Sequence, residues 1–252
     1  MHGIALAALF LAGALGGAIN AVAGGGSLVV FPALMLLGVP PVAANATAAT
    51  GLWPAGVAST IAYRSSLRGV GRGLLATLAI VSTGGGAAGA LLLLRTNDAS
   101  FLFIVPWLVL FATLVLTAGP RFRSHTTATA VPAMVPYLAQ LAVAVYGGYF
   151  GGGMGILMLA IFTALRGMKD LHAMNGVKTI LSVCINGAAI ALFVSSGKVA
   201  WPAAMAVALG SLAGGYGGAR VARIVDPARV RRVVLAMAWC LTGWFFYRVF
   251  LR

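Results

Sequence analysis

The chain has 252 residues, of which 61% are hydrophobic and only 8% are charged. A soluble domain carries about 25% charged residues, so this composition excludes a soluble globular protein and indicates an integral membrane protein with several membrane segments. The 17 Lys and Arg far exceed the 3 Asp and Glu. They stand in short clusters between apolar segments, a pattern that orients a membrane protein and does not form a nucleic-acid-binding face.

The first half of the chain predicts five apolar segments, and the second of them is unusually short. The segments cover roughly residues 3–23, 27–39, 42–63, 73–94 and 100–117, and Gly24-Gly25-Gly26-Ser27 separates the first two. About 12 residues of helix follow Ser27, or ~18 Å at ~1.5 Å per residue. A bilayer core is ~30 Å thick, so we favour a re-entrant hairpin for the first two segments.

The second half repeats this plan. Its five segments cover roughly residues 129–150, 155–165, 171–195, 199–219 and 230–250. Gly151 lies 127 residues after Gly24, and Asn175 lies 130 residues after Asn45. The near-constant offset predicts a duplication, with residues 1–120 as transmembrane repeat 1 and residues 121–252 as transmembrane repeat 2 of a single transport domain.

The charges of the connections predict that the repeats have opposite orientations. Residues 64–72 carry three arginines, whereas the turn at 95–98 is neutral. In the second half the connection near Lys198 carries one positive charge and residues 220–232 carry five arginines against one aspartate. Matching connections with opposite charge bias indicate inverted-topology repeats, with both termini outside the cell. The fold class is therefore an all-α polytopic membrane protein.

The glycine breaks are the first candidate for a binding site. A break inside a membrane leaves backbone N–H groups unpaired, and it is tolerated where a water-filled cavity receives them. The N-terminus of the following short helix directs N–H groups and a positive dipole end at the break, which suits an anion. The candidate residues are Gly24, Gly25, Gly26 and Ser27 in the first half and Gly151, Gly152 and Gly153 in the second. The alternative is that these glycines only permit close helix contact.

Lys178 is the strongest single candidate for a binding residue. It lies roughly seven residues into an apolar segment, ~10 Å deep along a helix. A charge within a membrane span costs at least ~2.5 kcal/mol and indicates a functional site. No Asp or Glu stands at that depth in the sequence, so a bound anion is the natural partner. The alternative is that the side chain reaches back to the interface along its apolar stem.

Uncharged polar residues near the breaks complete the candidate site. Asn45, Thr47 and Asn175 stand at the start of the segments that follow the short ones, and Thr50, Thr179 and Asn186 lie further along them. Their side chains can donate hydrogen bonds to an oxyanion, but helix capping and contacts between helices explain them as well.

Enzyme chemistry finds no support in the sequence. His2, His125 and His172 are scattered, and the chain has neither paired carboxylates nor the spacing of metal ligands. We expect no cofactor and no bound metal. Cys184 and Cys240 fall inside apolar segments and are expected to be small core residues.

Three stretches together resemble the TauE/SafE family of bacterial membrane transporters, and the resemblance covers nearly the whole chain. They are the two glycine breaks with the helices that follow them, GGGSLVVFPALMLLGVPPVAANATAATG and GGGMGILMLAIFTALRGMKDLHAMNGVKT, and the late stretch GGYGGARVAR. The resemblance implies a multi-pass permease of the bacterial inner membrane for small anions, with sulfite and organosulfonates such as sulfoacetate as substrates.

We therefore expect a secondary transporter that exports a small sulfur oxyanion, sulfonate or carboxylate by alternating access. Its partners would be the anion and the lipid bilayer, with no nucleic acid, and the glycine-rich faces permit a homodimer. An anion channel with the same pore is the first alternative. A membrane-embedded sulfur-handling enzyme or partner subunit that uses Cys184 or Cys240 is the second, and a scaffold subunit that binds no solute is the third.

Overall fold

The computed structural model describes residues 3–22, 25–67, 69–124, 134–164, 171–221 and 227–251. Within these ranges the chain forms ten α-helices and one 3-10 turn, and it forms no strand. The helices of the first half are α1 Gly3–Val22, α2 Ser27–Leu36, α3 Pro41–Tyr63, α4 Arg72–Arg95 and α5 Asp98–Ser124, with the 3-10 turn η1 at Arg64–Leu67. Those of the second half are α6 Val135–Tyr149, α7 Met154–Ala164, α8 Leu171–Ser195, α9 Trp201–Val221 and α10 Pro227–Phe250.

The all-helical class and the order of the segments are confirmed. α8 spans the predicted residues 171–195, and α1 ends one residue before the predicted end. α2 is as short as expected, with 10 residues. The largest difference is at α5, which has 27 residues and continues to Ser124, because an apolar window stops at the basic residues while a helix can carry them into the interface.

Within the described part of the chain, four helices are long and apolar enough to cross a membrane by length and composition. The qualifying stretches are Gly3–Asn20, Arg72–Arg95, Asp98–Val115 and Ala173–Ser195. α3 has 23 residues but carries several Asn, Ser and Thr side chains, which lower its hydropathy. That polarity fits a helix that faces the interior of a bundle instead of lipid.

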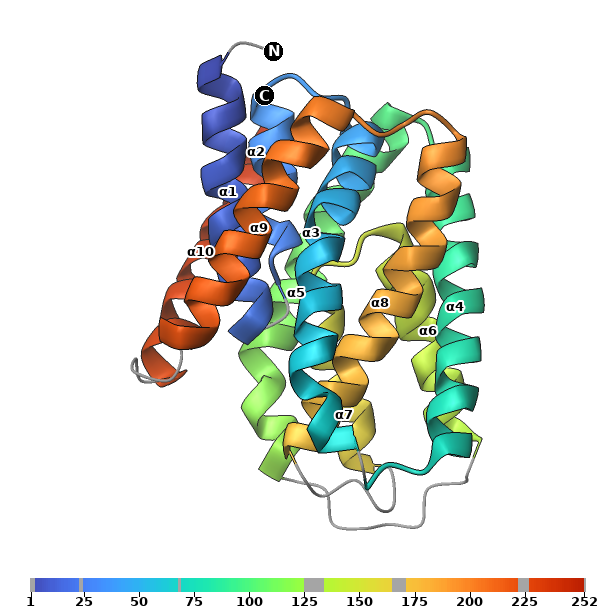
Figure 1. Cartoon of the computed structure of the whole chain (residues 1–252). Coiled ribbons are helices and arrows are strands. Elements are labelled where there is room, and N and C mark those ends of the chain that lie inside the picture. Colours follow the sequence, from blue (N-terminus) through green and yellow to red (C-terminus); the bar gives the residue numbers. More distant parts are fainter. Residues whose placement is uncertain are drawn as a thin grey trace.

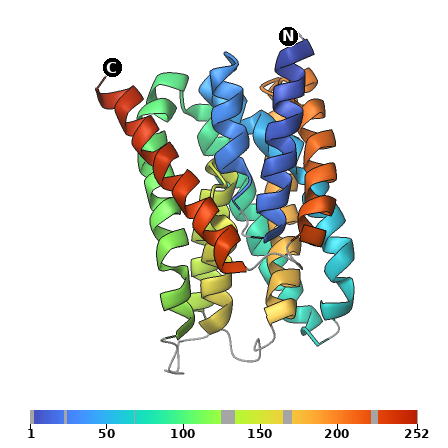
Figure 2. The same ribbon diagram turned by 90° about the vertical axis from the view of Figure 1, so that its left-hand side faces the viewer.

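The bundle has two different ends. Both termini lie at one end, together with the connections α2–α3, α4–α5 and α8–α9, and we call this end the terminal face (Figures 1 and 2). The opposite end holds η1 and the start of α4, with Arg64 and Arg72, and we call it the basic face. Exposed arginines at the basic face are consistent with a membrane interface there.

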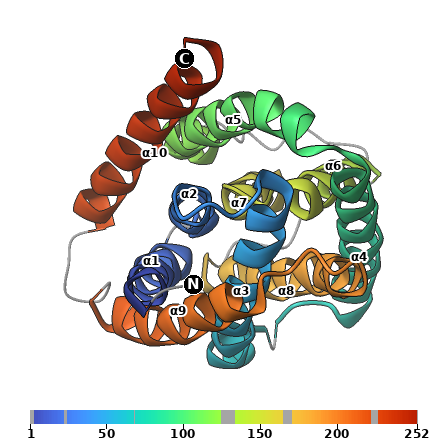
Figure 3. The same ribbon diagram turned by 90° about the horizontal axis from the view of Figure 1, so that it is seen from above.

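The two short helices lie inside the bundle. α1 and α2 both extend from the terminal face and meet at the first glycine break, whereas α6 and α7 extend from the basic face and meet at the second (Figures 1 and 2). Seen from the terminal face, α2 and α7 are enclosed by the longer helices, with α5 on one side and α3 and α8 on the other (Figure 3).

Small residues allow the enclosing helices to approach closely. α1 packs along α9, α4 packs against α6 and α8, and α3 packs against α8 and α9. A Cβ on Gly17 would lie 2.8 Å from the Cα atom of Ser211, and one on Gly86 would lie 2.8 Å from the Cα atom of Ile185. These backbones meet without intervening side chains, as is typical of helix contacts in membranes.

Candidate functional site

A cavity of about 80 Å³ lies between α3 and α8, at the point where the two glycine breaks converge. This volume is enough for a few water molecules or one small polyatomic ion. The first break contributes Asn20 and Ser27, and the second contributes Phe150, Gly151, Met154 and Gly155. The remaining lining comes from Asn45, Ala49, Leu52, Trp53, Gly56, Ser59 and Tyr63 on α3 and from Lys178, Thr179, Ser182, Val183 and Asn186 on α8.

The fold brings six of the predicted candidate residues to the cavity, and two of them, Thr179 and Asn186, are considered below. Ser27, Asn45, Gly151 and Lys178 all line it. Gly25, Gly26, Gly152 and Gly153 belong to the same two breaks but lie beside the lining, and Gly24 falls outside the described residues. The residues come from helices distant in sequence, so the cavity exists only when the two halves pack together.

The first break is shaped by close packing. Gly26 has φ −59° and ψ −31°, already in the helical region, and its carbonyl accepts hydrogen bonds from the N–H groups of Val29 and Val30. The N–H of Leu28 donates to Gly25 in the same way. These three amides are therefore used within the break, and Ser27 is the residue among 25–27 that lines the cavity. A Cβ on Gly26 would collide with the carbonyl group of Gly16 on α1.

The second break is shaped by backbone conformation. Gly151 and Gly153 have φ values of +77° and +76°, in the left-handed region that L-residues with a Cβ avoid. The N–H groups of Phe150 and Gly151 both donate to the carbonyl of Tyr146, which ends α6 with a glycine cap. The Tyr146 hydroxyl donates to the Gly152 carbonyl and ties the break to α6.

Lys178 supplies the only positive charge among the described residues of the lining, and none of them is acidic. It is 8% exposed, and among the described residues no hydrogen bond or ion pair forms to its ammonium group. An ammonium group is a strong donor of three hydrogen bonds. The cavity is therefore a site where one buried positive charge faces neutral hydrogen-bonding groups.

The other predicted polar residues have different surroundings. The Asn45 side-chain amide donates to the carbonyl of Tyr149 at 2.9 Å while also lining the cavity. The Thr47 hydroxyl accepts a hydrogen bond of 3.0 Å from the N–H of Ala200, so it joins α3 to the start of α9. Thr50 donates within its own helix, and Asn175, on α8, lies outside the lining. Thr179 and Asn186 do line the cavity.

Several lining residues were missed by sequence reasoning. Asn20 lies four residues before the first break, and a polar residue within an apolar segment is the sequence feature that could have identified it. Trp53 precedes a proline in the sequence, and its indole N–H donates to the Val183 carbonyl at 3.1 Å, which joins α3 to α8 beside the cavity. Ser59 and Ser182 carry no signal beyond a hydroxyl in an apolar helix.

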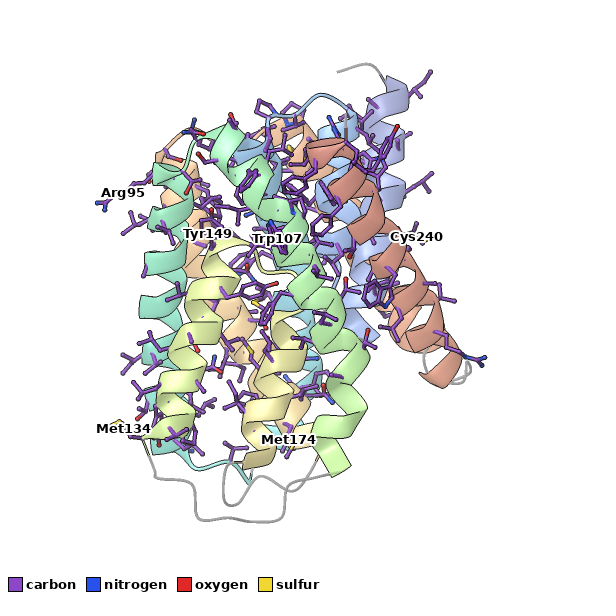
Figure 4. All side chains as sticks on the ribbon, turned by 180° about the vertical axis from the view of Figure 1, so that it is seen from behind. Arg95, Trp107, Met134, Tyr149, Met174 and Cys240 are labelled. Atoms are coloured by element: carbon purple, nitrogen blue, oxygen red, sulfur yellow. The ribbon has the colours of Figure 1, made fainter. Side chains whose placement is uncertain are left out.

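Towards the terminal face, apolar side chains close the space beyond the cavity. Phe31 on α2 packs against Phe101, Phe150 and Phe245 with ring centroids 6.0, 5.7 and 5.8 Å apart. Tyr149, which lies at the inner end of α6 (Figure 4), packs on Phe101 at 5.6 Å. All five rings belong to one buried apolar cluster. The described residues contain no group of three His, Cys, Asp or Glu side chains that could hold a metal ion.

Comparison with known proteins places the chain among membrane transporters. The family model described as "Sulfite exporter TauE/SafE" matches residues 9–245. A "Probable membrane transporter protein" of Haemophilus influenzae is 28% identical over 96% of this chain and 97% of its own length. The "Probable membrane transporter protein ORF9" of Sinorhizobium sp is 30% identical over 89% and 88%, and YfcA of Escherichia coli K12 is 27% identical over 96% and 90%. No solved structure matches significantly.

Proposed function

The chain belongs to the sulfite exporter TauE/SafE family of membrane transporters, and on this premise we propose that it is a secondary transporter that exports a small anion across the bacterial inner membrane. The observation that carries this proposal is the cavity between α3 and α8, where Lys178 and the two glycine breaks meet. Sulfite is the first candidate substrate because the family is named for it, followed by sulfoacetate, other organosulfonates and carboxylates.

The charge of the cavity supports an anion as the transported species. A lone ammonium group inside a membrane protein is costly, and a bound anion at Lys178 would offset that cost. Ser27, Asn45 and Asn186 carry uncharged donors that can complete the coordination of an oxyanion without fixing its charge state. A neutral or cationic solute would leave the lysine uncompensated.

The family membership and the apolar helices indicate a multi-pass membrane protein. The arginines at residues 64–72 favour the cytoplasm for the basic face by the positive-inside rule, and the termini then lie on the outer side. With this orientation the inside-negative potential favours exit of an anion by ~2.3 kcal/mol per charge at 100 mV. Export without a coupled cation is the simplest mechanism that fits a cavity whose described lining residues include no carboxylate.

Two hydrogen bonds support the interpretation of the halves as inverted repeats. Trp53 bonds to Val183, 130 residues later, and the Thr113 hydroxyl bonds to the Thr242 hydroxyl, 129 residues later, at 3.1 Å. These separations fall within the offset of 127 to 130 residues between the two halves of the sequence. A residue that touches its own counterpart lies on the two-fold axis that relates the repeats. The axis would pass between α3 and α8 and between α5 and α10, through the cavity.

The packing of the helices has the same symmetry. Exchanging α1–α5 with α6–α10 converts the contact of α1 with α9 into that of α6 with α4, and the contact of α3 with α9 into that of α8 with α4; all four contacts are present. The hairpins α1–α2 and α6–α7 extend from opposite ends, as re-entrant hairpins of inverted repeats would (Figure 1). Residues 1–120 and 121–252 would then be two halves that rock against each other around the anion.

Uptake of labelled sulfite into proteoliposomes tests this proposal, with Lys178→Ala beside the matched control Lys198→Ala. Lys198 lies exposed in the turn between α8 and α9, so it shares the charge but not the cavity. We expect saturable uptake, a loss of kcat/KM of about tenfold or more in Lys178→Ala, equivalent to ~1.4 kcal/mol, and no change in Lys198→Ala.

Sulfoacetate, sulfate and acetate as competitors rank the substrates in the same assay. Absence of sulfite uptake by folded protein would remove sulfite as the substrate. Saturable uptake that survives Lys178→Ala unchanged would remove the lysine from the site. Flux without counter-transport of labelled substrate, at rates far above those of carriers, would favour the anion channel.

A further inference from the structure

The cavity extends towards only one face of the bundle. On α3 its lining runs from Asn45 to Tyr63, the last residue of the helix, beside η1 at the basic face. On α8 the lining covers only the middle of the helix, from Lys178 to Asn186, and no described residue on either side of that stretch contributes. α3 runs from the terminal face to the basic face (Figure 1), so the lining residue Tyr63 places the opening at the basic face.

The counterparts of the residues at the opening are buried. With the offset of 130 that joins Trp53 to Val183, Ser59 corresponds to Ala189 and Tyr63 corresponds to Phe193. Ser59 and Tyr63 are half-buried and line the cavity, whereas Ala189 and Phe193 are each 1% exposed. Equivalent positions of the two helices are therefore open at the basic face and closed at the terminal face.

The closure at the terminal face involves the inner end of α6. Ala189 and Phe193 belong to the same buried apolar cluster as Tyr149 and Phe101. The Tyr149 hydroxyl donates to the Thr96 hydroxyl at 3.4 Å, which links the tip of α6 to the end of α4. We call Thr96, Tyr149, Ala189 and Phe193 the terminal-side gate.

Asn45 connects the gate to the cavity. Its side-chain amide donates to the Tyr149 carbonyl at 2.9 Å, and the residue also lines the cavity. An anion that competes for the amide protons of Asn45 weakens this bond to the gate. Two further hydrogen bonds hold α3 at the same face: the Val42 N–H donates to the Asp98 carboxylate at 2.8 Å, and the Ala200 N–H donates to Thr47.

We propose that this structure is the state open to the basic face, and that the opposite state opens a path along Ala189 and Phe193 when Tyr149 leaves the gate. In that state Ser59 and Tyr63 become buried, as their counterparts are now. This inference rests on the proposed alternating access of two inverted repeats. It names the surfaces that are exposed in one state and buried in the other. The loss of the Asn45–Tyr149 bond is the local event that joins anion binding to opening.

Cysteine accessibility tests the exchange. In a background with Cys184→Ser and Cys240→Ser, single variants Ser59→Cys and Ala189→Cys are labelled with a membrane-impermeant thiol reagent in right-side-out and inside-out vesicles. Gly69→Cys and Lys198→Cys are the controls for the basic and terminal faces, since both residues are exposed and a side chain at Gly69 meets open space. Both controls should react from their own side under all conditions.

The gate is then weakened with Tyr149→Phe, which removes the hydroxyl bound to Thr96 and keeps the ring, and with the stronger variant Tyr149→Ala. We expect labelling of Ala189→Cys from the terminal side to rise several-fold and labelling of Ser59→Cys from the basic side to fall in parallel. A simultaneous rise at both positions indicates a continuous pore and overturns the proposal. Unchanged labelling at both positions in both gate variants also overturns it.

The labelling needs no substrate, so its failure is separate from failure of the proposed function. A reciprocal change in labelling together with no sulfite uptake would remove sulfite but keep the gate. Sulfite uptake with no reciprocal change would keep the transporter and remove this gate. Unchanged rates at Gly69→Cys and Lys198→Cys show that the gate variants keep their orientation in the membrane, and an unchanged midpoint of thermal unfolding in detergent shows that they keep their fold.

Discussion

The two glycine breaks have nearly the same sequence but use their glycines for different physical purposes. In the first break Gly26 has helical dihedral angles and needs to be glycine because the backbone of Gly16 on α1 lies against it. In the second break Gly151 and Gly153 have left-handed dihedral angles and need to be glycine because of their own conformation. A triple glycine in a sequence therefore marks a break without revealing what maintains its shape.

The difference also concerns what each break presents to the cavity. The first presents the side chains of Asn20 and Ser27, and the second presents the Gly151 backbone with the flanking Phe150 and Met154. The shape of the first break depends on α1, whereas the second is fixed by its own turn and by the Tyr146 hydroxyl. We expect substitutions in the first break to act through helix packing and those in the second through local geometry.

Of the substitutions that test whether packing or local geometry maintains a break, Gly26→Ala should have the largest effect on stability. The new Cβ would collide with the carbonyl of Gly16, and backbone atoms cannot move aside as a flexible side chain can. We expect a loss of stability of about 1–3 kcal/mol, measured as a lower midpoint of thermal unfolding in detergent. The control is Gly25→Ala, whose Cβ would lie an ordinary 3.6 Å from a Leu28 methyl group. Equal effects of the two substitutions would show that packing does not define the first break.

Gly151→Ala tests whether the second break depends on its own backbone geometry. A left-handed conformation costs an L-residue with a Cβ about 1–2 kcal/mol, and relief of that strain would reshape the break beside the cavity. The control is Gly38→Ala, at φ +84° in an exposed turn of the terminal face. We expect both variants to lose similar stability but only Gly151→Ala to lose transport. Normal uptake by Gly151→Ala would mean that the backbone of this break does not shape the site.

The sequence predicted the helices well because a membrane imposes a simple rule on them. Each spanning backbone must satisfy its hydrogen bonds within its own segment, so apolar length alone located α1, α4 and α8. The cavity was less predictable. Lys178 and Asn45 stood out as polar residues in apolar segments, but the inclusion of Trp53 and Tyr63 depends on how α3 is rotated against α8. That rotation is decided by packing between distant helices, and no local pattern records it.

Tyr146→Phe weakens only the second break and therefore tests whether the two breaks are held independently. The variant keeps the ring, which packs against Phe111 and Phe150, and removes the hydroxyl that donates to Gly152. We expect a loss of about 1 kcal/mol and faster hydrogen exchange at the amides of residues 151–153, with the first break unaffected. Tyr247→Phe on the exposed part of α10 is the matched control. Faster exchange at both breaks would mean that they are mechanically coupled and not independently held.

Ser27→Ala should have the smallest effect on transport, because it removes one hydroxyl from the cavity without changing the backbone of the break. Ser27 faces the cavity and is half-buried, and its hydroxyl is one of several neutral donors around Lys178. Water can replace a single lost hydroxyl in a polar cavity, so the expected cost is ~0.5–1 kcal/mol, or about a two- to fivefold higher KM at unchanged kcat. Ser100→Ala, in the exposed first turn of α5, controls for the loss of a serine elsewhere. If Ser27→Ala instead lowers stability as Gly26→Ala does, the first break contributes packing alone, and anion recognition rests on Lys178 and the second break.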